Sequence, residues 1–187
     1  MVGRLEVITG CMFSGKTEEL VDRVLDGPGQ HELIVPEVAS EESSLTDNNW
    51  DVEPMIVKTD NREAREIVDS LDDDIGVVGL DRVNLFANKA NEICKLLLFD
   101  GYRVVVSGLD MDFRGAPFQP MDDLLCVADE VVKKKTDCQL CGKEANMTQR
   151  MINGRPARYN DSILMFGGSE EYFPVCRDCH TIKTEDD

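Results

Sequence analysis

The chain has 187 residues, 42% of them hydrophobic, and a formal net charge of −17 from 37 acidic against 20 basic side chains. This apolar share is enough to build a core, which excludes global disorder, and the length predicts one medium α/β domain or such a domain with a small appendage. So acidic a surface argues against a nucleic-acid partner and against an anionic membrane, because both require a surplus of lysine and arginine.

The acidic composition allows two interpretations. The surface is either simply well solvated, or it is typical of a halophilic protein in a high-salt cytoplasm, where screening makes the charge tolerable. The scarcity of lysine, with nine in the chain, favours the second. Residues 1–4 lead into a strand-like run without a signal peptide, and the apolar run at 96–99 is too short to span a bilayer. We therefore expect a cytoplasmic protein, of cellular or viral origin.

Hydrophobic periodicity predicts strands that alternate with helices. The first half of the chain is predicted to contain a strand at 4–9, a helix at 16–26, and strands at 33–35 and 55–57 separated by a polar loop at 36–53. A helix follows through Leu71, and Asp60 and Glu63 form its capping box. A strand at 75–80, a helix at 86–99 and a strand at 102–107 come next. This order indicates an α/β fold with a mostly parallel sheet flanked by helices. Turns, cysteines and short extended runs follow residue 136, which predicts a small C-terminal lobe.

A phosphate-binding motif stands between the first strand and the first helix. It fits G-x-x-x-x-G-K-[ST] in full and comprises Gly10, Cys11, Met12, Phe13, Ser14, Gly15, Lys16 and Thr17. The glycines let backbone N–H groups face the phosphates, Lys16 adds a charge at the β- and γ-oxygens, and Thr17 offers a hydroxyl to Mg²⁺. This P-loop predicts binding of a nucleoside triphosphate.

An acidic residue at the end of a neighbouring strand completes such a site by holding magnesium. Asp81 follows the apolar run at 76–80 and is the candidate. An aspartate after a strand is often only the start of a turn. Together with the phosphate loop, the pattern favours a magnesium ligand.

Two Cys-x-x-Cys pairs lie 34 residues apart in the last quarter of the chain, and they consist of Cys138, Cys141, Cys176 and Cys179. Two such knuckles close a tetrahedron around one ion, which predicts a structural Zn²⁺ site without an open position for catalysis. A redox role requires only one pair, and disulfides fit poorly in a reducing compartment. His180 is an alternative ligand, although an exposed histidine beside the site is the favoured interpretation. Cys11, Cys94 and Cys126 are expected to be buried or half-buried thiols.

These features together resemble the zinc-ribbon (type II) thymidine kinase family. The resemblance covers residues 1–25 and 100–180 well and the middle poorly. The strings that carry it are Met12-Phe13-Ser14-Gly15-Lys16-Thr17, Gly108-Leu109-Asp110-Met111-Asp112-Phe113-Arg114-Gly115 with Pro117-Phe118, Ala128-Asp129 through Cys138 and Cys141, Thr148-Gln149-Arg150, and Gly167-Gly168-Ser169-Glu170-Glu171-Tyr172 through Val175-Cys176-Arg177.

The resemblance implies a P-loop nucleotide-binding domain at 1–136 and a zinc-ribbon and lasso lobe at 137–187. It also implies ATP as phosphate donor, Asp81 as magnesium ligand, and assembly as a tetramer. The thymine slot would be formed by Met12, Leu109 and Phe113 and closed by the lasso near Ile163 and Tyr172.

The sequence departs from the family pattern at two catalytic positions. Where the family has an acidic pair, this chain has Asp81-Arg82, so an arginine replaces the glutamate expected to take the proton from the sugar hydroxyl. The Asp-Thr-Arg motif expected after the second strand is also absent, and residues 36–42 take its place. The catalytic base is therefore not identified by the sequence.

Three functions remain open. The first is ATP-dependent phosphorylation of thymidine to thymidine monophosphate, slowed by the missing base. The second is a degenerate kinase homologue that binds nucleotide or serves assembly without kinase activity. The third is a P-loop phosphotransferase acting on another nucleoside.

Overall fold

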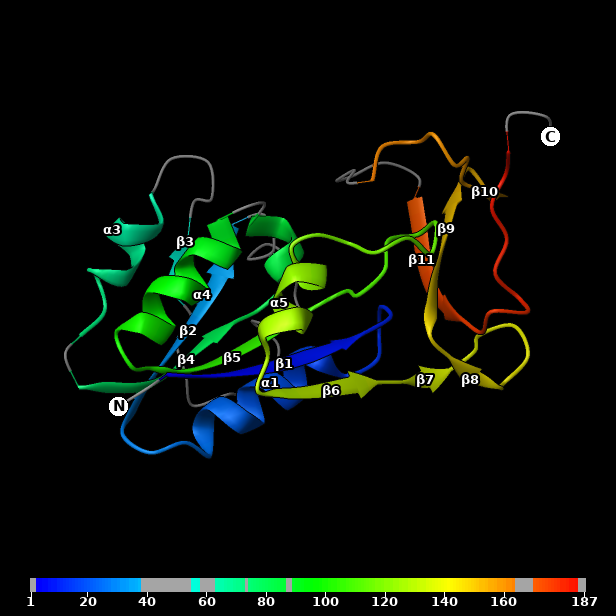
Figure 1. Cartoon of the computed structure of the whole chain (residues 1–187). Coiled ribbons are helices and arrows are strands. Elements are labelled where there is room, and N and C mark those ends of the chain that lie inside the picture. Colours follow the sequence, from blue (N-terminus) through cyan, green and yellow to red (C-terminus); the bar gives the residue numbers. More distant parts are fainter. Residues whose placement is uncertain are drawn as a thin grey trace.

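The computed structural model describes residues 3–37, 55–57, 63–72, 74–86, 89–163 and 170–184. Its main body is a six-stranded sheet in the order β3-β2-β4-β5-β1-β6, and every neighbouring pair of strands is parallel. Helices cover both faces, and shorter strands form a lobe at one end (Figure 1). The predicted fold class, a parallel α/β sheet with a small C-terminal cysteine lobe, is confirmed.

The strands of the main sheet are β1 (Arg4–Gly10), β2 (Gln30–Pro36), β3 (Met55–Val57), β4 (Ile75–Leu80), β5 (Arg103–Gly108) and β6 (Glu130–Lys134). The helices are α1 (Lys16–Leu25), α3 (Ala64–Val68), α4 (Lys89–Phe99) and α5 (Met121–Val127), with a 3-10 turn η1 (Val83–Phe86). The lobe contains β7 (Thr136–Asp137), β8 (Glu144–Ala145), β9 (Met147–Ile152), β10 (Arg155–Pro156) and β11 (Glu170–Val175).

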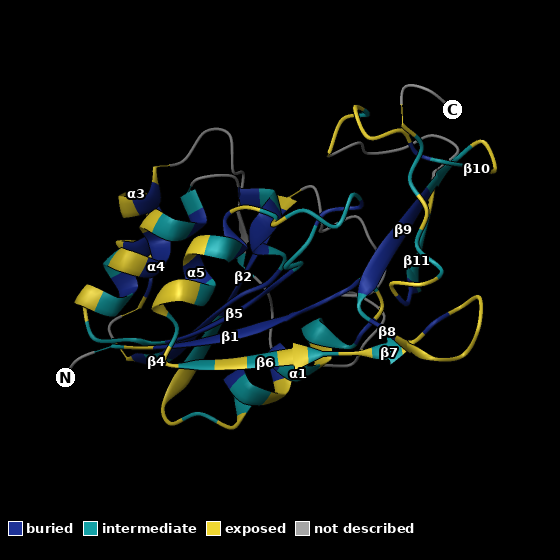
Figure 2. Ribbon diagram, turned by 45° about the vertical axis from the view of Figure 1, so that its right-hand side comes forward, coloured by how far each residue is buried: buried dark blue, intermediate teal, exposed yellow. Residues whose placement is uncertain are grey.

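The central strands are buried on both faces, which is why they read as continuous apolar runs. In β5, Val104 and Val106 pack on the side of α3, α4 and α5, whereas Val105 packs on the side of α1. Helix α1 contributes Leu20, Val21 and Val24 to the second cluster. Figure 2 shows these buried central strands beside the more exposed edge strand β6.

Three local predictions differ from the structure. The capping box uses Glu63 and Glu66, and α3 ends at Val68; Asp60 lies outside the described residues. The helix expected at 86–99 is replaced by the turn η1 and, from Lys89, by α4. Helix α5 and strand β6 were not predicted, because both are short and half of the side chains of β6 face water.

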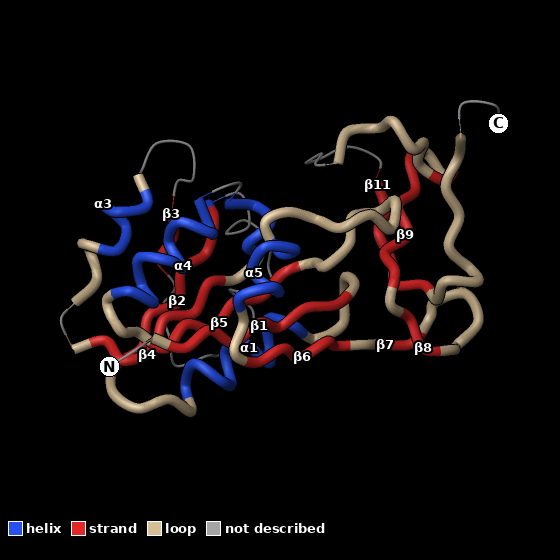
Figure 3. The backbone as a smooth tube through the Cα atoms, in the orientation of Figure 1, coloured by secondary structure: helices blue, strands red, loops and turns tan. Residues whose placement is uncertain are grey.

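The lobe is built on a three-stranded antiparallel sheet in the order β10-β9-β11, next to a β7–β8 hairpin that continues the line of β6 (Figure 3). Residues 147–150 of the central strand β9 are all buried, including three polar side chains. The Gln149 carboxamide donates to the Thr181 carbonyl at 2.8 Å and accepts from the Thr181 N–H at 2.9 Å, which ties the C-terminal segment to β9. Across the described ranges, no helix is both long and apolar enough to cross a membrane.

A buried carboxylate organises a charge network beside the sheet. Glu6 of β1 has a side chain only 5% exposed and accepts from Arg23 at 2.9 Å and from Arg103 at 2.8 Å. Burial alone would raise the pKa of Glu6, but hydrogen bonds and charge from Arg103 and Arg23 outweigh it and lower the pKa below its ordinary value.

This network predicts a pH-dependent contribution to stability. Because the pKa of Glu6 is lowered on folding, its contribution is present above the unfolded pKa and is lost as pH falls through the folded value. We expect Glu6→Gln to cost about 2 kcal/mol at pH 7, less than a fully buried pair because the arginines keep contact with water. Its melting temperature should also fall less steeply than that of the wild type from pH 5 to pH 3. Glu92→Gln, at an exposed position of α4, is the control, and parallel pH profiles for wild type and Glu6→Gln would contradict the assignment.

Candidate functional site

The phosphate loop connects β1 to α1 at the carboxyl edge of the sheet. Gly15 has φ 76°, a left-handed conformation, and α1 begins directly after it. A Cβ on Gly10 would lie 2.3 Å from the Lys134 carbonyl oxygen, so only glycine lets the loop pass this close to β6. The carbonyl of Cys11 accepts from Ser14 Oγ at 2.8 Å and from Lys16 Nζ at 2.7 Å. The loop thus holds its own lysine beside the N-terminus of α1, an arrangement suited to an anion.

Thr17 and Asp81, the two residues proposed for magnesium, are in direct contact. Thr17 Oγ1 donates to Asp81 Oδ2 at 3.0 Å, and Ser107 Oγ donates to the other carboxylate oxygen. Asp81 is fully buried. Burial raises its pKa, against hydrogen bonds from Ser107 and Thr17 and the charges of Arg82 and Lys16. A buried carboxylate beside a hydroxyl is a donor set that fits Mg²⁺.

Arg82 follows Asp81 with φ 54°, in the left-handed region that non-glycine residues rarely adopt. Its Nε lies 3.6 Å from Asp81 Oδ2, and its side chain is 21% exposed. Backbone strain of this kind often concentrates at functional sites. Arg82, which stands where the family pattern has a glutamate, therefore lies against the Asp81 carboxylate beside the phosphate loop.

Two of the residues predicted for the nucleoside slot meet around a buried cation. The guanidinium carbon of Arg150 lies 4.9 Å from the centroid of the Phe113 ring and 5.8 Å from that of Tyr172. Arg150 is fully buried, and its Nη1 donates to the Ser162 carbonyl at 2.5 Å, one residue before Ile163. These contacts bring Phe113, Tyr172 and the segment leading to Ile163 to one place on β9.

Met12 and Leu109, which were also predicted for the slot, are held by different partners. The N–H of Met12 donates to Thr148 Oγ1 at 3.1 Å, two positions before Arg150 on β9. Leu109 is bound through its backbone to the side chain of Asn84. Sequence reasoning used Thr148 and Arg150 only as marks of family resemblance. The signal that could have revealed them is the polar Thr148-Gln149-Arg150 run, which the structure places at buried positions of β9.

Some predicted features fall outside the described residues. They are the lasso residues Gly167, Gly168 and Ser169 and the larger part of the 36–53 loop. Ile163, the last described residue before the lasso, is 37% exposed.

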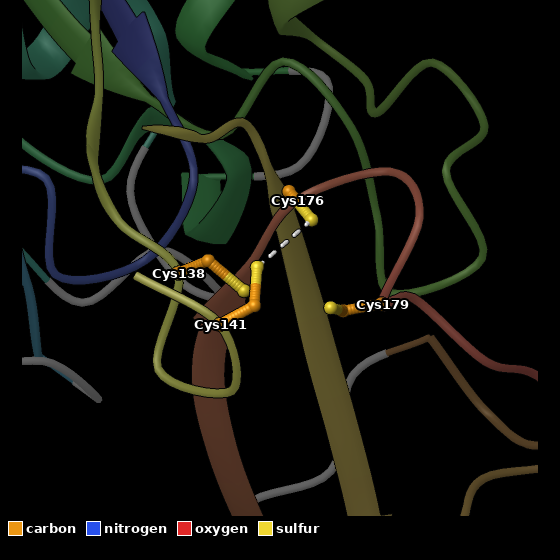
Figure 4. A group of neighbouring side chains, drawn as sticks. All are labelled: Cys138, Cys141, Cys176 and Cys179. Carbon is orange, nitrogen blue, oxygen red and sulfur yellow. Dashed lines mark hydrogen bonds between the residues drawn. The ribbon is translucent and has the colours of Figure 1, made fainter. Parts of the chain in front are cut away.

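The four predicted metal ligands form one cluster (Figure 4). The sulfur atoms of Cys138, Cys141, Cys176 and Cys179 all lie within 4.8 Å of one another. Thiolates about 2.3 Å from a tetrahedral zinc lie about 3.8 Å apart, and the Cys141 and Cys176 sulfurs are 3.6 Å apart. Burial opposes ionisation of Cys138, but backbone hydrogen bonds from Cys176, Leu140 and Cys141 lower its pKa to about 6. The donor set and spacing fit Zn²⁺.

His180 and the three cysteines outside the cluster agree only in part with the burial predicted for them. His180 Nε2 lies 2.8 Å from the Phe113 carbonyl, so this histidine links the lobe to the 109–119 segment and is half-buried rather than exposed. Cys11 and Cys94 are buried, as predicted, but Cys126 is exposed. Cys126 lies on the outer side of α5, a helix that the sequence did not reveal.

The cysteine lobe packs directly on the phosphate loop. Cys11 shares one apolar cluster with Cys138, Cys176 and Val175, and its Sγ donates to the Ala145 carbonyl at 3.8 Å. Burial raises the pKa of the Cys11 thiol, which keeps it neutral in this contact. With the bond from Met12 to Thr148, two successive loop residues are fixed by the lobe.

The fold and the site define an α/β protein with a parallel sheet, a glycine-rich strand-to-helix loop and a four-cysteine lobe. The family model for thymidine kinase matches residues 3–180. The chain therefore belongs to the thymidine kinase family, which confirms the resemblance inferred from its motifs.

Proposed function

We propose that the protein is a thymidine kinase that transfers the terminal phosphoryl group of ATP to thymidine, with slow turnover. The observation that carries the proposal is the contact between Thr17 and Asp81 at the mouth of the glycine-rich loop, in a member of this family. The Met12–Thr148 and Arg150–Phe113 contacts support a nucleoside slot beside it.

The geometry supports a division of labour within the site. Backbone N–H groups of the loop and Lys16 would hold the triphosphate, while Thr17 and Asp81 would hold a magnesium ion. When bound, magnesium supplies positive charge at the bridging phosphate oxygens. The four cysteines would hold a structural zinc that keeps the lobe, and with it the slot, in place. Residues 1–136 would then form the nucleotide-binding domain and 137–187 the lobe, in a tetramer.

A test of the proposal is phosphoryl transfer measured with purified protein, ATP and magnesium, at low and at molar KCl. Thymidine is compared with deoxyuridine, deoxycytidine and deoxyadenosine. Transfer to thymidine in preference to the others supports the proposal. Transfer to another nucleoside supports a different phosphotransferase. ATP binding without any phosphoryl transfer favours a degenerate kinase homologue that only binds nucleotide. The specific observation in favour of that alternative is Arg82, which stands where the family pattern has a glutamate.

Binding of ATP itself depends on Lys16 in this scheme. We expect Lys16→Ala to raise the dissociation constant for ATP by about 100-fold or more, because a charged hydrogen bond to phosphate is lost in a partly buried site. The measurement is isothermal titration calorimetry, with Lys95→Ala, at an exposed position on α4, as the control. An unaltered isotherm for Lys16→Ala would show that the phosphate loop is not the binding site for ATP.

A further inference from the structure

The side chain of Asn84 joins the end of β4 to the segment that contains the proposed thymine slot. Asn84 is 6% exposed. Its Oδ1 accepts from the Leu109 N–H at 2.7 Å. Its Nδ2 donates to the carbonyl oxygens of Leu109 at 3.0 Å, Phe118 at 3.3 Å and Gln119 at 3.2 Å. One amide group therefore closes both ends of the segment 109–119.

Hydrogen bonds within the segment 109–119 brace it internally. Asp112 Oδ1 accepts from the N–H groups of Arg114 at 2.8 Å and Ala116 at 3.1 Å, and the Phe118 N–H donates to the Asp110 carbonyl at 3.0 Å. The tip of the segment presents Phe113 to the lobe. The base of the segment, where Asn84 binds it, therefore contributes to the position of Phe113, together with the contacts of the tip with Arg150 and His180.

Asn84 lies close in the chain to Asp81 and Arg82, the residues proposed to serve phosphoryl transfer. Asn84 lies in η1, two residues after Arg82, and Val83 and Phe86 of the same turn are both fully buried. A Cβ on Gly108 would lie 2.7 Å from Asn84 Oδ1, so the absence of a side chain at Gly108 permits the close approach. A continuous series of covalent and hydrogen-bonded contacts therefore runs from Asp81 through Asn84 to the segment that carries Phe113.

We propose that Asn84 is the positioning residue that sets the nucleoside slot relative to the phosphate loop. The inference rests on the proposed function and adds to it a residue that touches neither substrate. Its four hydrogen bonds all end on the segment 109–119 rather than on the loop of residues 10–17. A change at Asn84 should therefore affect the nucleoside and leave the affinity for ATP in place.

The chemistry of the amide makes the test selective. Asn84→Asp keeps the size and the acceptor but loses both N–H donors, and it sets a carboxylate against three carbonyl oxygens. Asn84→Gln keeps donors and acceptor with a longer reach, and it is the conservative variant. Asn91→Asp is the matched control, because within the described part of the chain the Asn91 side chain on α4 donates from Nδ2 to Asp123 Oδ2 of α5 at 2.9 Å and makes no hydrogen bond to the segment 109–119.

The experiment compares these variants by calorimetry with thymidine and with ATP, by KM and kcat, and by hydrogen exchange of residues 109–119. We expect Asn84→Asp to raise the dissociation constant and KM for thymidine about tenfold or more and to speed exchange at Leu109, while the ATP constant stays within about twofold. Asn84→Gln should restore part of the loss. Asn91→Asp, which sets a carboxylate against Asp123, should lower the melting temperature but match the wild type in both affinities and in exchange at Leu109.

Two outcomes overturn the inference alone: thymidine affinity that is unchanged in Asn84→Asp, or ATP and thymidine affinities that fall together in both Asn84 variants. A wild-type protein that binds ATP but neither binds nor phosphorylates any nucleoside overturns the proposed function, and this inference with it. If Asn84→Asp does not fold, Asn84→Gln and Asn84→Ser decide between the same outcomes. Thymidine affinity equal to the wild type in both would count against the role.

Discussion

Replacing Cys176 with serine is expected to release the metal from the lobe, to lower the melting temperature and to weaken the binding of ATP. Four cysteine sulfur atoms lie within 4.8 Å of one another, and a zinc ion bound between them would hold together two short turns of the chain. Structural zinc contributes about 10–16 kcal/mol in isolated zinc-finger peptides. Loss of even about 4 kcal/mol would lower the melting temperature of a chain of this size by about 8–16 °C.

The effect on ATP follows from the contact between the lobe and the phosphate loop. The Cys11 thiol packs in the same apolar cluster as Cys138 and Cys176, and the N–H of Met12 is bound by Thr148. Release of the cluster would free two loop residues whose backbone groups must otherwise point at the phosphates. We expect the dissociation constant for ATP to rise about tenfold, a coupling of about 1.4 kcal/mol that lies within the range common for linked sites.

Linkage also requires the reverse effect. Saturating ATP should slow the transfer of zinc to a chromophoric chelator, because any coupling between two binding sites is reciprocal. Cys126→Ser is the matched control, since Cys126 is exposed on α5 and lies outside the cluster. One zinc per chain in the wild type, measured by elemental analysis, is the starting requirement. Loss of zinc from Cys176→Ser with unchanged melting temperature and unchanged ATP affinity would contradict both the structural role and the coupling.

Local sequence patterns predicted the parts of the fold whose contacts are local. The motif of residues 10–17 dictates a strand before it and a helix after it, and the structure has both. Apolar runs such as 75–80 are long enough to specify buried strands. Strand β6 was missed because an edge strand exposes every second side chain, so that lysines interrupt its pattern.

The contacts that complete the candidate site join residues far apart in the sequence. Met12 meets Thr148 across 136 positions, and Asn84 meets Leu109 across 25. No periodicity encodes such pairs. Arg150 is the clearest case, because a fully buried arginine in an acidic protein contradicts the rule that charged residues face water. It is tolerated because aromatic rings and the Ser162 carbonyl surround it.

Arg82 is the departure from the family pattern that bears most directly on the proposed phosphoryl transfer, because it stands where the pattern has the glutamate expected to act as base. A guanidinium has no lone pair with which to accept the proton of a sugar hydroxyl. It lies beside the buried Asp81 carboxylate, near the place where the phosphates would enter. In the proposed kinase, the arginine would therefore take the place of a base and add positive charge, which would stabilise the charge of a phosphoryl group in transfer.

We expect Arg82→Glu to raise kcat for thymidine by about 10- to 100-fold, because a positioned general base contributes about 10²–10⁴-fold and part of that is offset by repulsion from Asp81. Arg82→Ala should lower kcat about tenfold, because it removes the charge without supplying a base. Arg82→Lys retains the charge, and its kcat should lie between those of Arg82→Ala and the wild type. All three variants keep the unfavourable left-handed backbone at φ 54°, so differences among them report on the side chain.

Steady-state kinetics with thymidine, with ATP binding measured in parallel, distinguishes the remaining alternatives. A gain in Arg82→Glu with a loss in Arg82→Ala would show a slow kinase that exchanged its base for an electrostatic clamp. A gain in both variants would mean that Arg82 inhibits transfer instead of assisting it. If the wild type and all variants bind ATP with similar affinity and none transfers phosphate, the kinase proposal fails. Thr17, Asp81 and Arg82 would then form the binding site of a nucleotide-binding protein, in which the arginine binds the triphosphate and no phosphoryl group is transferred.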